Sequence, residues 1–397
     1  MKQITLIPPS GYLKKIIGRA KTTTGIVALL LTAQWGNAQN WENVGSAETV
    51  SAGGTSFNNL VVDAAGNYYI SYYDVSVAKG SVQKFDGTNW SYVGGSAGIT
   101  TGSATFNALA YAADGSIYYS NQLAYPGSGM EVRKFSNGAW SQLPNVNSTG
   151  INSQAIAVSH DNTLFAFNGE NSGTVKRFVN NAWEQVGNTG FSGGATFAEM
   201  VVSQSGKVYL CNVANGFVQV YHHGTEVTEG NWVLTGGTTV GAASSSEQFS
   251  SDIALDQNDN VYVAYVSNGA EGQLLNVKKF DGSGWAQVGA ANFSSGRIQH
   301  VALAVTATGK PYVVASRWEN DDLLKNTAYK FDTDSNSWLV FGDAYISSGQ
   351  ATYNDLAIDE VNQYLVLTYS QGGAKVKRIS ITENLSLIHI SEPTRRT

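Results

Sequence analysis

Acidic and amide side chains recur at one position of the sequence, directly before a short apolar run. They are Asn59, Glu199, Asp252 and Asp355, which precede Leu-Val-Val, Met-Val-Val, Ile-Ala-Leu and Leu-Ala-Ile, respectively. Carboxylate and amide oxygens bind cations and sugar hydroxyls. Two carboxyl groups at a suitable separation could also hydrolyse a glycosidic bond. A structural role stays open as well, in which these residues cap strand ends beside water.

Aromatic and basic side chains in two long connections are further candidates for ligand binding. Trp318 follows Arg317 and departs from the regular spacing of most other tryptophans, so its indole face could stack on a sugar. Tyr125 offers an aromatic face in another predicted loop.

Asp332, Asp334 and Asn336 place oxygen ligands at alternate residues, as calcium loops do. The segment lacks the glycine at the sixth position of an EF-hand loop. We therefore consider calcium a candidate cofactor here, beside the alternative of an ordinary long turn.

Residue sets for nucleophilic or redox catalysis are missing from the sequence. The single cysteine, Cys211, stands inside a repeat, and the histidines are scattered. No Ser/His/Asp triad or glycine-rich phosphate loop stands out. The pattern favours a non-catalytic binding protein and leaves catalysis by the recurring carboxyl groups as an alternative.

A long repeat organises the chain. Seven of the nine tryptophans recur at intervals of 43 to 53 residues, namely Trp41, Trp90, Trp140, Trp183, Trp232, Trp285 and Trp338. Several end a phrase such as Lys84-Phe-Asp-Gly-Thr-Asn-Trp90, whose Asp-Gly or Asn-Gly pair is typical of a tight β-hairpin. Because these tryptophans occupy one place in every repeat, we expect them to pack between neighbouring repeats.

A second predicted hairpin precedes each of six Trp phrases, for example at 60–73 and 109–120. Two hairpins make a four-stranded antiparallel sheet, which is one blade of a β-propeller. The last repeat lacks its Trp strand, whereas the segment 40–45 is such a strand without a repeat. The sequence therefore predicts an all-β, seven-bladed propeller in which the N-terminal strand completes the last blade and closes the ring.

Loop lengths predict where a ligand would bind. The first and last connections of each blade are tight, whereas the middle connection and the link to the next blade are long. Long connections share one face in a propeller, and binding sites concentrate on such loops. The recurring position of Asn59 is expected at the mouth of the central channel on this face.

The two ends of the chain differ from the repeats. Residues 1–38 carry five Lys or Arg and no acid, followed by a short apolar run, which is typical of a cleaved signal peptide. Residues 385–397 look like a translated sequencing adaptor, so the native protein is expected to continue past Asn384. The predicted domain, 39–384, is more acidic than the whole chain's net charge of −6. We therefore expect no nucleic-acid partner. The apolar run of the signal peptide is too short to span a bilayer, so we expect no membrane span in the mature chain. We expect the protein to be a monomer that is secreted or lies on the cell surface.

The Phe-turn-Trp phrase, repeated over 40–380, resembles kelch-like and related propellers of large secreted bacterial proteins, including cargo of the type IX secretion pathway. The resemblance implies a propeller and an extracellular location. Three functions follow as hypotheses. The first is a non-catalytic binding or adhesion module for a glycan or a cell-surface protein. The second is a carbohydrate-active hydrolase or lyase that uses the loop-face carboxylates. The third is a structural spacer for a missing C-terminal domain.

Overall fold

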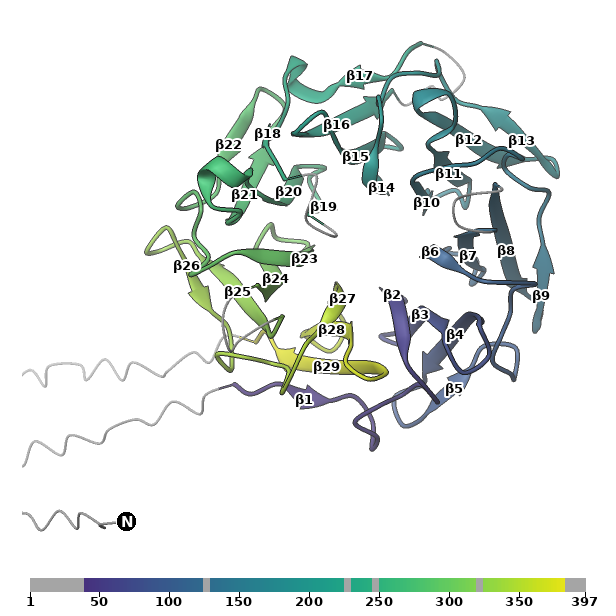
Figure 1. Ribbon diagram of the computed structural model, residues 1–397, viewed down its shortest axis with the longest axis horizontal. Coiled ribbons are helices and arrows are strands. Elements are labelled where there is room, and N and C mark those ends of the chain that lie inside the picture. Colours follow the sequence, from purple (N-terminus) through teal and green to yellow (C-terminus); the bar gives the residue numbers. More distant parts are fainter. Residues whose placement is uncertain (1–38, 124–128, 225–229, 245–249, 319–323, 383–397) are drawn as a thin grey trace, which may run out of the picture. The chain divides into compact units, whose positions relative to one another are not determined.

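The computed structural model describes residues 39–123, 129–224, 230–244, 250–318 and 324–382. These residues form seven antiparallel sheets arranged around a central axis, with almost no helix (Figure 1). The predicted seven-bladed propeller is thereby confirmed. No described helix is long and apolar enough to cross a membrane.

Each blade runs outward from the axis in strand order. Blades 1 and 2 contain β2 (Thr55–Val62), β3 (Tyr68–Asp74), β4 (Lys79–Phe85), β5 (Trp90–Tyr92), and β6 (Thr105–Tyr111), β7 (Ile117–Gln122), β8 (Met130–Ser136), β9 (Ala139–Gln142). Blades 3 and 4 contain β10 (Gln154–Val158), β11 (Leu164–Asn168), β12 (Thr174–Val179), β13 (Ala182–Gln185), and β14 (Thr196–Val202), β15 (Val208–Ala214), β16 (Phe217–His223), β17 (Val233–Leu234), with an added β18 (Gly241–Ala242). Blades 5 and 6 contain β19 (Ser251–Leu255), β20 (Val261–Val266), β21 (Leu275–Phe280), β22 (Trp285–Gln287), and β23 (Ile298–Val305), β24 (Pro311–Arg317), β25 (Asn326–Asp332), β26 (Ser337–Val340).

Blade 7 joins the two ends of the repeat array. It contains β27 (Thr352–Asp359), β28 (Tyr364–Ser370), β29 (Ala374–Ser380) and the N-terminal β1 (Glu42–Asn43). Strand β1 pairs with β29, and the Val44 amide donates a hydrogen bond of 3.0 Å to the Val376 carbonyl. The predicted ring closure is therefore confirmed, and it leaves no open end of the array available for edge-to-edge aggregation.

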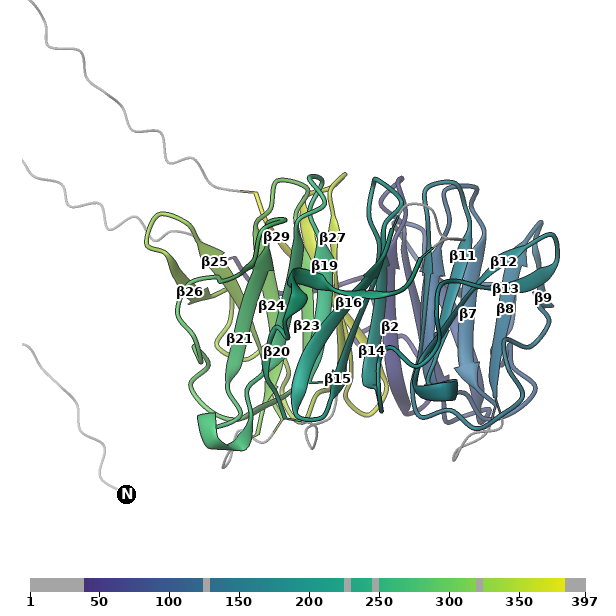
Figure 2. The ribbon, with the colours of Figure 1, turned by 90° about the horizontal axis from the view of Figure 1, so that it is seen from above.

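In the described residues, short 3-10 helices lie in three connections, at η1 (Glu170–Ser172), η2 (Thr235–Gly237) and η3 (Gly269–Glu271). Figure 2 shows the blades edge-on, with hairpin turns at one end of the inner strands and longer connections at the other. The two faces therefore differ as the loop lengths predict.

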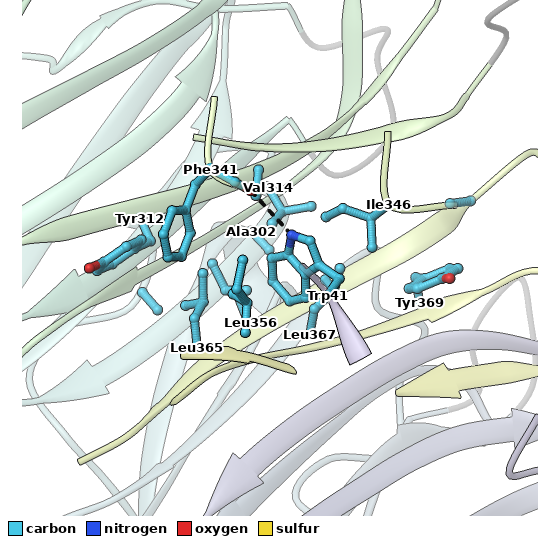
Figure 3. Close-up of a cluster of buried hydrophobic side chains, with 14 residues drawn as sticks. Trp41, Ala302, Tyr312, Val314, Phe341, Ile346, Leu356, Leu365, Leu367 and Tyr369 are labelled. Carbon is cyan, nitrogen blue, oxygen red and sulfur yellow. Dashed lines mark hydrogen bonds between the residues drawn. The ribbon is translucent and has the colours of Figure 1, made fainter. Parts of the chain in front are cut away.

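The seven repeated tryptophans link each blade to the preceding one. Every indole Nε1 donates to a backbone carbonyl near the outer strand of that blade, at 2.6 to 3.2 Å. Trp41 closes the cycle, because it donates to Phe341 of blade 6 and packs against Leu356 and Leu367 of blade 7 (Figure 3). The tryptophans are thus part of the core between blades, as expected.

The glycine that follows most of these outer strands has a packing reason. Gly94 adopts a φ of +87°, and a Cβ there would lie 2.7 Å from Cδ1 of Trp140 in the next blade. A side chain would clash with the indole and strain the backbone. A glycine after the accepting carbonyl, most often in a Val-Gly pair, therefore lets six of the seven tryptophans approach; Trp183 donates to Pro144, which Asn145 follows.

Replacing Trp41 should show how much the closure stabilises the ring. We expect Trp41→Ala to lower the free energy of unfolding by about 3 to 5 kcal/mol, because a buried indole and its hydrogen bond are lost. Trp318→Ala is the matched control and should change it by less than about 0.5 kcal/mol, since Trp318 is 37% exposed. Denaturant unfolding measures both; equal effects of the two substitutions would contradict the closure role.

Candidate functional site

A pocket of about 400 Å³ lies at the mouth of the channel, where the inner strands begin. We call it the mouth pocket; its lining includes Phe57, Asn58, Asn59, Phe106, Phe197, Glu199, Asp252, Tyr353 and Asp355. The structure therefore brings together the four recurring polar residues, from blades 1, 4, 5 and 7. Its volume is in the range of small-molecule sites in proteins.

Aromatic residues in an unusual backbone conformation stand at the rim of this pocket. The inner strands of five blades carry a bulge, and in each of them one residue is left-handed, with φ between 48° and 55°: Phe57, Phe106, Phe197, His300 and Tyr353. This conformation costs a non-glycine residue about 1 to 2 kcal/mol. Blades 3 and 5 have Ser153 and Ser250 at the equivalent position and no such bulge.

The bulges gather rings from three neighbouring blades side by side. The ring centroid of Phe57 lies 4.7 Å from that of Phe106 and 4.9 Å from that of Tyr353. Behind them, the ring of His300 lies 5.2 Å from Tyr353, and its Nδ1 accepts a hydrogen bond from the Tyr353 amide. Burial lowers the pKa of His300 to about 3, so this imidazole is neutral. We call Phe57, Phe106 and Tyr353 the aromatic arc.

Two of the carboxyl groups connect neighbouring blades. Asp252 accepts hydrogen bonds of 2.7 Å from the amides of Ile253 and of Leu303 in blade 6. Asp355 accepts equivalent bonds from Leu356 and from Leu60 in blade 1, at 2.7 and 2.6 Å. The structural role considered for these residues therefore applies to both aspartates.

Glu199 occupies the same position in blade 4 with a side chain one methylene longer. Within the described residues its carboxyl group accepts no hydrogen bond from a neighbouring blade or from its own strand. Its carboxyl group lines the mouth pocket instead. Of the three acids, Glu199 is thus the one whose whole carboxyl group is available to a ligand.

Burial raises the pKa of all three acids, and negatively charged neighbours add to this at Glu199 and Asp252. Burial lifts the pKa of Glu199 well above its ordinary value, and the negative charges of Asp252 and Asp355 add to the effect. Burial raises the pKa of Asp252 to about 7, with a contribution from Asp355, and that of Asp355 to about 6. The groups reach water only through the pocket and are otherwise surrounded by protein, so charge is poorly solvated there.

One amide at the pocket wall lacks partners. Asn58 is 6% exposed, and within the described part of the chain neither its Nδ2 nor its Oδ1 has a hydrogen-bond partner. The equivalent Asn354 donates to the His300 carbonyl at 2.7 Å, and the equivalent Asn107 accepts from Asn59 at the same distance. Buried amides normally find partners, so Asn58 points to a ligand or an ordered water.

Other predicted site residues lie elsewhere. Arg317 ends β24, where its Nη1 donates to the Tyr345 hydroxyl at 3.2 Å. The Trp318 amide donates to the Arg297 carbonyl, and neither Arg317 nor Trp318 lines the mouth pocket. The prediction for Tyr125 falls outside the described residues, as do those for 1–38 and 385–397.

The predicted calcium segment forms the turn between β25 and β26. The Asp332 carboxylate accepts hydrogen bonds from the amide and the hydroxyl of Ser335, which caps the turn. Asp334 and Asn336 are exposed. Among the residues that the structure describes, no group of three or more His, Cys, Asp or Glu side chains could hold a metal ion. The Asp332–Ser335 hydrogen bonds are those of an ordinary turn, and calcium binding at this segment stays a prediction.

The aromatic arc was missed by the sequence reasoning, although a signal was present. A Ser or Thr followed by an aromatic residue occurs at the same offset in four repeats, at Ser56-Phe57, Thr105-Phe106, Thr196-Phe197 and Thr352-Tyr353. In a regular strand, side chains point alternately to the two faces of the sheet, and the aromatic residue would follow this alternation. The bulge that redirects it is a tertiary feature, and bulges are frequent beside binding sites.

No family model matches the chain, and no curated protein matches it in sequence. Solved structures resemble it in fold. A PL25 polysaccharide lyase, an ulvan lyase bound to a GlcA(1-4)Rha3S saccharide, has a TM-score of 0.56 at 10% identity, over 84% of this chain and 96% of that chain.

Two further structures are similar at lower scores. An Aleuria aurantia lectin mutant in complex with Fucalpha1-6GlcNAc has a TM-score of 0.47 at 12% identity, over 76% of this chain and 98% of that chain. A protein of unknown function from Dyadobacter fermentans has a TM-score of 0.48 at 10% identity, over 86% and 97% of the two chains. At 10% identity the likeness to the lyase shows the fold alone, and the ligand must be argued from the site.

The raised carboxyl pKa values predict how stability depends on pH. The folded acids hold protons more tightly than the unfolded chain does, whose acids titrate near pH 4. The stabilisation that these protonated acids add to the folded state is therefore complete below about pH 4, and it is lost as the pH rises to about 7. Glu199→Gln removes the least compensated acid, so at about pH 8 it should raise the unfolding free energy by about 1 kcal/mol and the Tm by about 2 °C.

Thermal unfolding from about pH 4 to about pH 8 is the measurement, with the exposed Glu271→Gln as the control. The control should leave the pH profile unchanged. A Glu199→Gln protein that is less stable than the parent at every pH would show that the carboxyl group has a stabilising partner after all.

Proposed function

We propose that this protein is a carbohydrate-binding module whose mouth pocket receives a sugar. The observation that carries the proposal is the aromatic arc. Its three residues have left-handed backbone and line the same pocket as Asn58 and Glu199. Sugar rings have apolar faces that pack on aromatic rings and hydroxyl edges that hydrogen bond to amides and carboxyls. A pocket that offers both aromatic rings and polar groups suits such a ligand.

The strain supports a binding role. Packing alone does not need a left-handed Phe or Tyr, because Ser153 and Ser250 occupy the equivalent positions without a bulge. Residues kept in costly conformations concentrate at ligand sites. The ulvan lyase that shares the fold is bound to a saccharide, which makes glycans the first ligand class to test.

A carbohydrate-active hydrolase or lyase is the second candidate, favoured by Glu199. A carboxyl group with a raised pKa and no hydrogen-bond partner among the described residues is suited to act as a general acid. Asp252 and Asp355 are less suited to a catalytic role, because both oxygens of each accept backbone hydrogen bonds. We therefore favour binding without turnover.

The proposal also includes four predictions. These are secretion through residues 1–38, an adhesive role, a relationship to kelch-like or type IX proteins, and a monomeric state. The segment that would direct export lies outside the described residues. A secreted or surface location would place the pocket where extracellular glycans are available.

Substitution of the aromatic arc tests the binding site. Phe57→Asn and Phe106→Asn remove the rings, and asparagine tolerates the left-handed conformation, so the bulges should persist. We expect each variant to weaken binding of a glycan selected on a glycan array by about tenfold, which corresponds to about 1.4 kcal/mol. Isothermal titration measures the affinity, and thermal unfolding confirms the fold.

Trp318→Ala serves as the comparison, because Trp318 lies outside the pocket and was the alternative stacking residue. Loss of binding in Trp318→Ala with full binding in both Phe variants would place the site in the other loop. Assays for reducing ends and unsaturated products run on the same glycan; turnover that Glu199→Gln abolishes would favour the enzyme over the binding module.

A further inference from the structure

The mouth pocket holds three carboxyl groups that pair with no basic side chain of the described residues. Burial, neighbouring carboxylates and backbone amides shift the pKa values of Glu199, Asp252 and Asp355. Among the described residues, no Lys, Arg or His side chain contributes to these shifts. His300 is neutral because it is buried, and the Cys211 thiol beside Glu199 and Asp252 has a pKa raised by burial. Tyr353 likewise has a pKa raised by burial, so it carries no charge.

The three acids retain capacity for a ligand. Each oxygen of Asp252 and Asp355 uses one lone pair for a backbone amide and keeps another. Glu199 keeps its entire carboxyl group. The Asn58 amide, buried at the same pocket without a partner in the described part of the chain, adds an acceptor oxygen and two N–H donors.

A metal ion does not fit this arrangement. In the described residues no set of three acidic, histidine or cysteine side chains is placed so that it could hold a metal. The acids come from blades 4, 5 and 7 and face the axis from separate strands. A protonated amine does not need ligands at metal-bonding distances, because its N–H groups can hydrogen bond to one or two of these carboxyl groups over longer distances.

The aromatic arc suits the same kind of ligand. Aromatic faces attract organic cations through the electrostatics of the ring. They also pack against a sugar ring. Phe57 and Tyr353 stand at the rim beside Asp355, which follows Tyr353 by two residues on the bulged strand β27.

Building on the proposed carbohydrate binding, we infer that the ligand of the mouth pocket is an amino sugar with a free, positively charged amine. The sugar ring packs on the aromatic arc, the ammonium group lies among Glu199, Asp252 and Asp355, and Asn58 bonds a hydroxyl group. Binding of the ammonium group favours the ionised form of the carboxyl groups. Protons that these carboxyl groups hold in the empty pocket are therefore released when the ligand binds.

Two disaccharides that differ only in N-acetylation, and therefore in whether the nitrogen is charged, test this inference. The probes are the β-1,4-linked disaccharide of glucosamine and its N-acetylated form, titrated calorimetrically at about pH 6, where the amine is charged. We expect the amine form to bind about tenfold more tightly. Titration in buffers of different ionisation enthalpy should show proton release for the amine form.

Variants separate the contributions of charge and ring. Glu199→Gln keeps the shape of the side chain and should reduce the preference for the amine form about fivefold. Phe57→Asn should weaken the binding of both probes, and the control Glu271→Gln should change the affinity for neither probe. A Tm that stays within the range of the parent protein shows that each variant is folded.

The outcomes distinguish this inference from the proposed function. Equal or tighter binding of the N-acetylated probe overturns the amine preference and leaves carbohydrate binding standing. Failure to bind either probe or any array glycan, with the fold intact, overturns both. Tighter binding of lysine amide than of the glucosamine disaccharide also overturns the inference, because it would identify a basic protein side chain as the ligand.

Discussion

The pairing of β1 with β29 is the contact on which the ring depends. It consists of a short stretch around Val44 that completes blade 7, together with the Trp41 indole that reaches back to blade 6. Because the same Trp-to-carbonyl link recurs at every junction, the blades repeat one interface around a closed cycle. Closure is what forces seven inner strands to face a common axis.

That constraint explains why side chains far apart in sequence meet at one pocket. Glu199, Asp252 and Asp355 each begin the apolar part of an inner strand, so the ring geometry directs all three toward the channel mouth. Their roles then diverge through small chemical differences. The two aspartates are short enough to accept amides of the next blade, whereas the extra methylene of Glu199 leaves its carboxyl group in the pocket.

The bulges add a second, local departure from the repeat. Phe57, Phe106 and Tyr353 occupy left-handed positions that regular strands avoid, and they thereby form the rim of the pocket. Five of the seven blades carry the bulge, whereas the acids occur in three blades alone. The site therefore combines a widely shared bulge with side chains that differ from blade to blade, on a scaffold whose regularity comes from the tryptophans and glycines.

Local patterns in the sequence were sufficient for the architecture and for one part of the site. The Trp spacing, the hairpin turns and the divided last repeat determined seven blades and their closure, because each blade is encoded by contiguous residues. The alignment of repeats also determined that Asn59, Glu199, Asp252 and Asp355 share a position at the mouth. The tertiary structure alone decided that Trp318 and Arg317 lie outside the pocket, that Asp332 caps a turn, and that an aromatic arc and an unpartnered Asn58 complete the site. The reason is physical: bulges, shared hydrogen bonds and mutual charge effects arise between blades, and neighbours across a blade junction are far apart along the chain.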